Sequence, residues 1–201
     1  MKSLRCIVIL LFGTSFVLGQ LVHRTESLNK PADQPEVVVR NLYLQIVARH
    51  PMGIPTDVDL NALAPYLSGG LIGRIDLALS CEDDYYRQHN DPNEKPAIAW
   101  LEFGLFSGAN ERVSPHAFHI EKTQGRKDGS FRVLVRLTYD EPEGPGNWRV
   151  AAVVVREKGH FVVDDIIYLK DETGEVESRL SKTLTHGCRG PRWVGYGEER
   201  K

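Results

Sequence analysis

The apolar positions in the first half of the chain repeat with helical spacing. The first repeat predicts an amphipathic helix over about residues 34–49, with an apolar stripe formed by Val38, Leu42 and Ile46. We expect a short helix or turn near 56–67 and then a longer helix that ends at about Gln88. Ser68 can cap this longer helix, whose expected apolar stripe is Leu71, Ile75 and Leu79.

After Pro96 the apolar period changes from helical to alternating, which predicts strands. The strands expected from this alternation lie at 118–121, 130–139, 148–157 and 160–169. Residues 142–146, which read Pro-Glu-Gly-Pro-Gly, predict a turn between the second and third of these strands. Lys158 and Gly159 form a two-residue turn between the last two. Helices followed by strands with short connections are typical of an α+β fold, and we expect the helices to cover one face of a curved antiparallel sheet.

The first 19 residues have the order of a secretory signal peptide. Lys2 and Arg5 give a positive start, and residues 6–17 are almost all apolar and carry no charge. Val17 and Gly19 then occupy the −3 and −1 positions of a cleavage site before Gln20. The apolar run is shorter than the roughly 20 residues that span a bilayer, and the alternative is an uncleaved anchor. We therefore expect cleavage before Gln20, export to the periplasm or the medium, and a flexible leader over 20–34.

Charge and motifs exclude several classes of function. The net charge is −2, and removal of Lys2 and Arg5 with residues 1–19 would take it to −4. Such a mildly acidic chain without a basic stripe does not predict a nucleic-acid binder. No second apolar run reaches membrane length, and neither HExxH nor CxxC occurs, so we expect no transmembrane segment after cleavage, no metal and no cofactor.

Two cysteines, Cys81 and Cys188, remain once the signal peptide is removed. In an oxidising compartment these two residues can form one disulfide, and the alternative is a pair of separate free thiols. The sequence leaves both possibilities open, because it does not give the distance between the two Cα atoms.

Four segments together resemble a known family. In chain order they read LAPYLSGGLI at 63–72, CEDDYY at 81–86, KPAIAWLEFGLF at 95–106 and WRVAAVVVREKGHFVVDDIIY at 148–168. This order is similar to that of the exported bacterial NTF2-like proteins grouped as DUF3828, a domain of unknown function. The resemblance covers about 35–185 and leaves 186–201 as a C-terminal tail. It implies a cone of helices packed on a curved sheet, and it supplies no catalytic residue.

Asp164 and Asp165 are the first candidates for chemistry. Neighbours on a strand point to opposite faces, so we expect one of the two to face the concave side of the sheet. Desolvation there would raise its pKa and suit it to general-base catalysis. The alternative is a carboxylate that accepts hydrogen bonds from a loop or a helix terminus. Tyr85 and Tyr86 could aim hydroxyls into the same cone or close an edge of the core.

Three aromatic residues, Trp100, Phe103 and Phe106, are candidates to line a ligand pocket, although core packing is the alternative for at least two of them. We expect a non-enzymatic module that binds a small apolar ligand or a protein partner. The alternatives are an enzyme with a pocket carboxylate, such as a lyase, isomerase or hydrolase, and an immunity or inhibitor protein.

Overall fold

The computed structural model describes residues 33–89, 98, 100, 103–110, 113–140, 146–170 and 173–196. The chain divides into residues 1–30 and a compact unit of residues 31–201. The expected signal peptide and almost all of the expected leader lie outside the described residues, as does most of the turn at 142–146. The description below concerns the second unit.

Three helices precede the sheet, and side-chain caps begin the second and third of them, whereas the first has no side-chain cap. The helices are α1 (Pro35–Arg49), α2 (Asp57–Leu63) with a single 3-10 turn after it (Ala64–Tyr66), and α3 (Gly69–Gln88). Thr56 Oγ1 accepts a hydrogen bond from Asp59 N at 3.3 Å, and Ser68 Oγ accepts one from Leu71 N at 2.9 Å. Both hydroxyls satisfy backbone N–H groups that have no partner within the helix.

The apolar stripe of α3 differs from the predicted one at its third position. The buried residues are Leu71, Ile75, Ala78, Cys81 and Tyr85, whereas Leu79 is exposed. A helix turns about 100° per residue, so a strict spacing of four drifts by about 40° at each step. The drift takes Leu79 off the core side, and Ala78 takes its place.

Five strands form one antiparallel sheet in the order β3-β4-β5-β6-β7. Their bounds are β3 Ala117–Gly125, β4 Phe131–Tyr139, β5 Gly146–Glu157, β6 His160–Leu169 and β7 Val176–Arg179. The first is longer than expected, and β7 carries no alternation that predicts it. Lys158 and Gly159 both have positive φ, as a two-residue hairpin turn requires.

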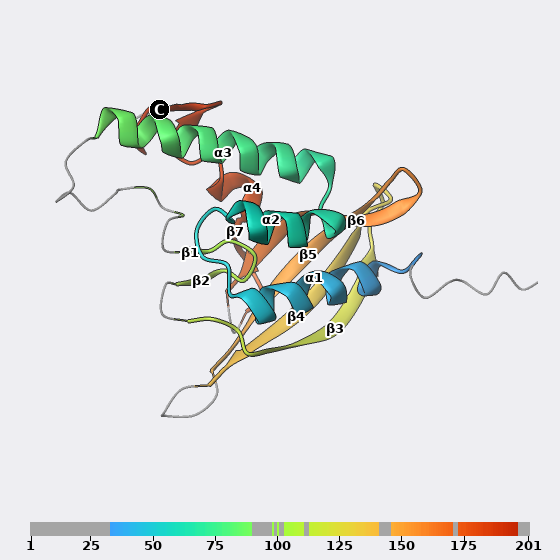
Figure 1. The fold of residues 1–201 in the computed structure, drawn as a ribbon. Helices are drawn as coiled ribbons and strands as arrows, with labels where there is room; N and C mark the ends of the chain where they lie inside the picture. The colour runs from blue at the N-terminus through green and yellow to red at the C-terminus, as the bar shows by residue number, and fades with distance from the viewer. Residues whose placement is uncertain are drawn as a thin grey trace, which may run out of the picture. The chain divides into compact units, whose positions relative to one another are not determined.

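The helices lie on one face of the sheet, with α1 packed across β3, β4, β5 and β6 (Figure 1). Between the two layers lies the main core, which includes the fully buried side chains Leu42, Ile75, Leu137 and Ile166. This arrangement confirms the α+β class. The remaining elements are a small hairpin, β1 (Phe103–Gly104) with β2 (Ala109–Asn110), then α4 (Leu180–Thr183), and a second hairpin, β8 (Cys188–Arg189) with β9 (Arg192–Trp193).

Candidate functional site

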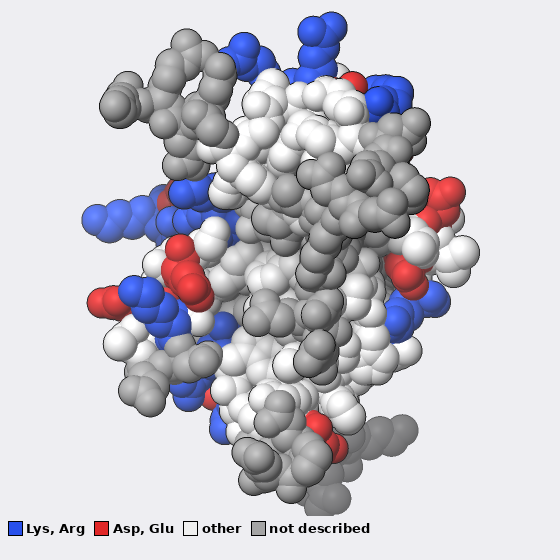
Figure 2. Space-filling view, turned by 90° about the vertical axis from the view of Figure 1, so that its left-hand side faces the viewer, with Lys and Arg blue, Asp and Glu red and all other residues white. Residues whose placement is uncertain are grey.

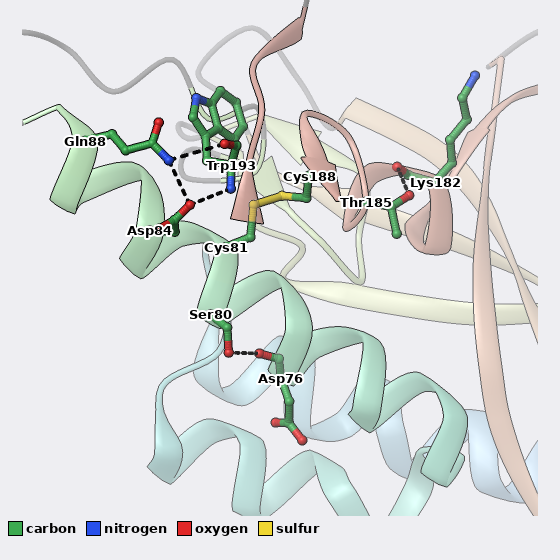
Figure 3. The surroundings of a disulfide bond; sticks show 9 residues. All are labelled: Asp76, Ser80, Cys81, Asp84, Gln88, Lys182, Thr185, Cys188 and Trp193. Atoms are coloured by element: carbon green, nitrogen blue, oxygen red, sulfur yellow. Dashed lines mark hydrogen bonds between the residues drawn. A yellow bond between two sulfur atoms is a disulfide. The ribbon is translucent and has the colours of Figure 1, made fainter. Parts of the chain in front are cut away.

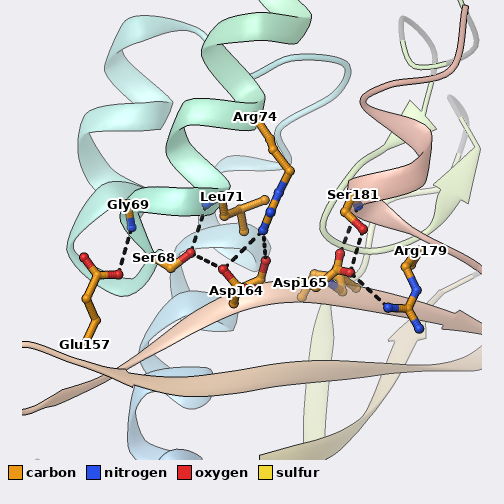
Figure 4. A network of polar contacts seen from close by, with 10 residues as sticks. Ser68, Gly69, Leu71, Arg74, Glu157, Asp164, Asp165, Arg179 and Ser181 are labelled. Atoms are coloured by element: carbon orange, nitrogen blue, oxygen red, sulfur yellow. Dashed lines mark hydrogen bonds and ion pairs between the residues drawn. The ribbon is translucent and has the colours of Figure 1, made fainter. Parts of the chain in front are cut away.

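Asp164 and Asp165 occupy a β-bulge in β6. Val163 lies opposite Val154 and Asp165 lies opposite Val153, so that Asp164 has no partner residue on β5. A bulge inserts one extra residue into a strand and shifts the alternation that follows. The expectation that the two carboxylates point to opposite faces is therefore wrong. Figure 4 shows both on the same side of β6, directed toward the first turns of α3 and α4.

Asp164 holds the start of α3. Its Oδ1 accepts hydrogen bonds from Ser68 Oγ at 2.5 Å and from Arg74 Nη2 at 3.2 Å, and Arg74 also donates to the Asp164 backbone oxygen at 2.8 Å. Glu157 adds a second contact, because its Oε2 accepts from Gly69 N at 3.1 Å. Negative charge beside a helix N-terminus is favourable, so these carboxylates anchor α3 on the β5–β6 hairpin (Figure 4).

Asp165 holds the start of α4 and is only 6% exposed. Its carboxylate accepts from Ser181 N at 2.9 Å, from Ser181 Oγ at 2.7 Å and from Ile166 N at 3.0 Å. Arg179 Nη1 lies 3.7 Å from Oδ2. Each aspartate thus serves a helix terminus, and these contacts support the structural interpretation of the pair over the catalytic one.

The two tyrosine candidates lie at the other end of α3. Tyr85 is buried, stacks on His89 with ring centroids 4.3 Å apart, and meets Trp193 edge-on at 5.1 Å. Tyr86 is 45% exposed. Tyr85 is 17 positions beyond Ser68, which corresponds to about 25 Å of helix. The aspartates and tyrosines therefore do not form one site.

The cysteines form a disulfide, which settles the two possibilities left by the sequence. Cys81 on α3 and Cys188 on β8 are joined, with Cα atoms 6.1 Å apart (Figure 3). Asp84 Oδ2 accepts from Trp193 N at 2.9 Å, and Gln88 Nε2 donates to the Trp193 oxygen at 3.3 Å. The region expected as a separate tail is thus folded onto α3 up to Tyr196, the last residue described there.

Most of the predicted pocket aromatics are part of the core. Trp100 and Phe106 are fully buried, as the packing alternative requires, and Phe103 is partly buried with its ring edge-on to Tyr168 at 5.2 Å. Tyr168 Oη donates to the Leu105 oxygen at 2.6 Å, and Tyr43 Oη donates to the Phe106 oxygen at 2.9 Å. Burial raises the pKa of both hydroxyls, so both keep their protons as donors.

An open recess of about 520 Å³ lies at the end of the sheet where β4 ends and β5 begins. The end of β6 and part of the β1–β2 hairpin complete its wall. We call it the aromatic recess, after the three rings among its lining residues Tyr139, Trp148, Arg149, Tyr168, Lys170 and Glu177. None of the three aromatic residues proposed from the sequence lines it.

The rings of the aromatic recess are fixed by contacts with the backbone and with each other, and two glycines leave the space that the rings occupy. Trp148 Nε1 donates to the Ser107 oxygen at 2.6 Å, and the Trp148 and Tyr139 rings meet edge-on at 5.5 Å. A Cβ at Gly146 would overlap the Tyr139 ring, and one at Gly108, where φ is +72°, would lie 2.9 Å from the Tyr168 ring. The positions of these rings are therefore fixed by contacts within the fold.

The sequence predicts the recess residues as parts of separate strands, and it does not predict that they come together at one end of the sheet. One signal was available, because Tyr139 and Trp148 flank the predicted turn at 142–146 and a hairpin brings such flanking residues together. The register gives Thr138 opposite Asn147 and Leu137 opposite Trp148, so the two rings are diagonal neighbours. Tyr168 offered no local signal, since only the pairing of β6 with β5 brings it to the recess.

Two further findings concern the described residues. They contain no group of three or more His, Cys, Asp or Glu side chains placed to hold a metal ion. None of the helices within the described ranges is long and apolar enough to cross a membrane. Comparison of the chain with protein-family models, with curated proteins and with solved structures finds no match.

Proposed function

We propose that the chain is a non-enzymatic, exported binding module that holds a small, mainly apolar ligand in the aromatic recess. The recess itself is the observation that carries this proposal. Its volume of about 520 Å³ is within the range of roughly 300–1,000 Å³ common for small-molecule sites. Aromatic rings with a few polar groups at the margin are also the usual lining of such sites.

The described surface around the recess carries few charged side chains. Figure 2 looks onto this end of the molecule, and the middle of its described surface is mostly without Lys, Arg, Asp and Glu. Tyr139, Trp148 and Tyr168 offer ring faces and edges for a planar group. Arg149 and Lys170 lie beside them, so a ligand with an aromatic body and one anionic group fits the lining best.

The concave side of the sheet gives less support to the enzyme alternative. An active site needs titratable groups that converge on one pocket. The candidate aspartates hold the starts of α3 and α4, and Tyr85 packs beneath the C-terminal hairpin. Trp100 and Phe106 are buried in the main core and do not line the aromatic recess. We therefore favour ligand binding over catalysis by a pocket carboxylate.

We also propose that the domain is NTF2-like and related to DUF3828. Helices that precede a five-stranded antiparallel sheet and cover one of its faces support this assignment. Export is supported by the order of residues 1–19 and by the disulfide, since disulfides persist outside the reducing cytosol.

A thermal-shift screen of the exported protein against planar aromatic acids tests the proposed function, with 8-anilinonaphthalene-1-sulfonate as the first probe. Ligands of this class should raise the Tm of the wild type, because they bind only the folded state. The shift should be lost in Trp148→Ala and kept in Tyr86→Ala, which removes an exposed aromatic ring at the far end of α3. Equal shifts in the two variants would place the binding elsewhere.

A further inference from the structure

The face of the sheet away from the helices carries a second, smaller apolar cluster. It consists of Ala151, Val153, Ile167 and Leu169, with Leu134 packed against them. These positions alternate along β4 and β5 with core residues such as Val133, Val135 and Ala152. Because successive strand residues point to opposite faces, the cluster marks the outer face of the sheet.

Cationic side chains frame this cluster. One cross-strand row runs from Lys122 through Leu134, Ala151 and Ile167 to Arg179, so a cation lies at each end of an apolar centre. Along β4, Arg132 and Arg136 flank Leu134 on the same face, two residues away on either side. We call Lys122, Arg132, Leu134, Arg136, Arg149 and Arg179 together the outer basic face.

The basic groups are only partly neutralised. Glu121 lies between two of them, with Oε1 2.8 Å from Arg136 Nε and Oε2 2.9 Å from Arg149 Nε. Only the Arg149 contact has hydrogen-bond geometry. The side chain of Arg132 makes no hydrogen bond or ion pair with any other described residue. Five cations lie on this face, where Glu121 pairs with Arg136 and Arg149, and Asp165 reaches Arg179 from its place beside α4. The whole chain, in contrast, has a net charge of −2.

The surface over this region is hollowed. A recess of about 380 Å³ lies on the outer face, and Lys122, Arg132, Leu134, Arg149 and Leu169 are among its lining residues. In Figure 2 the side turned away from the helices is at the left, where Lys and Arg side chains gather with a few acidic ones. Charge and shape therefore point to an occupant that is acidic and has a small apolar part.

We propose that the outer basic face docks an extended, acidic segment of a partner protein. The cations are spread along and across strands instead of converging on one point, which suits a chain better than a single anion. Arg132 and Arg136 are four residues apart on β4, or about 13 Å in an extended strand. An extended peptide with acidic residues at positions i and i+4 and an apolar residue at i+2 has the same spacing, and its apolar residue meets Leu134.

The proposal stands on a different surface from the ligand proposal and does not depend on it. Arg149 lines both recesses, so its replacement would not distinguish the two. Arg132 lines only the outer recess and Arg136 lines neither, so these two are the residues to change. Arg40 on α1 is the matched control, because it is an exposed arginine on the helical side of the molecule.

Fluorescence anisotropy with a labelled peptide that repeats the pattern Glu-Thr-Ile-Thr tests the proposal. We expect saturable binding to the exported protein, weakened by added salt because the contacts are between exposed charges. The double variant Arg132→Gln with Arg136→Gln should bind at least about tenfold more weakly, while Arg40→Gln should bind as the wild type does. Unchanged Tm values will show that all variants are folded.

Four outcomes would overturn the proposal. The first is no binding of the acidic peptide to the wild type, and the second is equal binding of a peptide with Lys in place of Glu. The third is an equal loss of peptide binding in Arg40→Gln, which would mean that the net charge of the protein alone determines the affinity. The fourth is self-association of the wild type that the double variant abolishes in sedimentation, which would make a second copy the occupant.

Discussion

Replacement of Asp165 by alanine should destabilise the fold through the loss of buried hydrogen bonds. The carboxylate accepts from the backbone N–H groups of Ile166 and Ser181 and from the Ser181 hydroxyl. In Asp165→Ala the hydroxyl can turn toward water, but two backbone donors lose their acceptor. Each unsatisfied buried donor costs about 1–3 kcal/mol, so we expect a loss of about 3 kcal/mol.

The assay is thermal unfolding followed by circular dichroism. For a domain of this size 1 kcal/mol corresponds to roughly 2–4 °C, so Asp165→Ala should lower Tm by about 6–12 °C. Asp165→Asn keeps one acceptor oxygen, so its loss of stability should be about half that of Asp165→Ala. Asp164→Ala should cost about 1 kcal/mol, because its side chain is 35% exposed and Ser68 still caps α3.

Asp140 provides the control, since its side chain is 78% exposed and Asp140→Ala should change stability by less than about 0.5 kcal/mol. The reasoning would be refuted if Asp165→Ala melted like the wild type. A rise in Tm of Asp165→Ala would instead support the catalytic interpretation, because active-site carboxylates often lower the stability of the folded state.

Three further predictions concern other parts of the chain. Thiol counting on the unfolded, unreduced exported protein, which has lost Cys6 with the signal peptide, should find no free thiol, and two free thiols per chain would contradict the disulfide. The double variant Cys81→Ser with Cys188→Ser should lose about 2–4 kcal/mol of stability, since the bond closes a loop with a sequence separation of 107. Burial, and then the charge of Asp83, raises the pKa of Glu82, so protonation of Glu82 favours the folded state. Glu82→Gln should therefore raise Tm at pH 8, and this gain in Tm should vanish at a pH below the ordinary glutamate pKa of 4.5. A gain in Tm of equal size at pH 8 and below pH 4.5 would contradict the raised pKa of Glu82. Mass spectrometry of the exported protein should find Gln20 at the N-terminus, and a chain that still carries Met1 would show that no cleavage occurs.

Features that depend on a few neighbouring residues were predictable from the sequence. Ser68 caps α3 by accepting a hydrogen bond from Leu71 N, only three residues ahead in the chain. The Lys158–Gly159 turn needs only two neighbouring residues with positive φ. The α+β class followed in the same way, because the order of helical and alternating periods is written along the chain.

Features that depend on distant pairing were not predictable. The bulge at Asp164 exists because β5 and β6 shift register there, and no local pattern in VVDDII marks the shift. The β8–β9 hairpin lies in a segment that the sequence predicts as a tail rich in Gly, Arg and aromatic residues, and only its contacts with α3, through Cys188 and Trp193, fold it onto the domain. The aromatic recess likewise gathers Trp148 and Tyr168 from two strands, whereas the candidates Trp100 and Phe106 turned inward because large apolar rings fill the core first.

The central claim, that the aromatic recess binds the ligand, is tested most directly by the indole N–H signals of the protein in two-dimensional NMR. The chain has three tryptophans, and Trp148→Phe assigns one of the three signals. During titration with 8-anilinonaphthalene-1-sulfonate, the Trp148 signal should shift in a saturable manner while the signals of Trp100 and Trp193 stay in place. A shift confined to Trp193, or none at Trp148 when the probe is bound, would contradict the account.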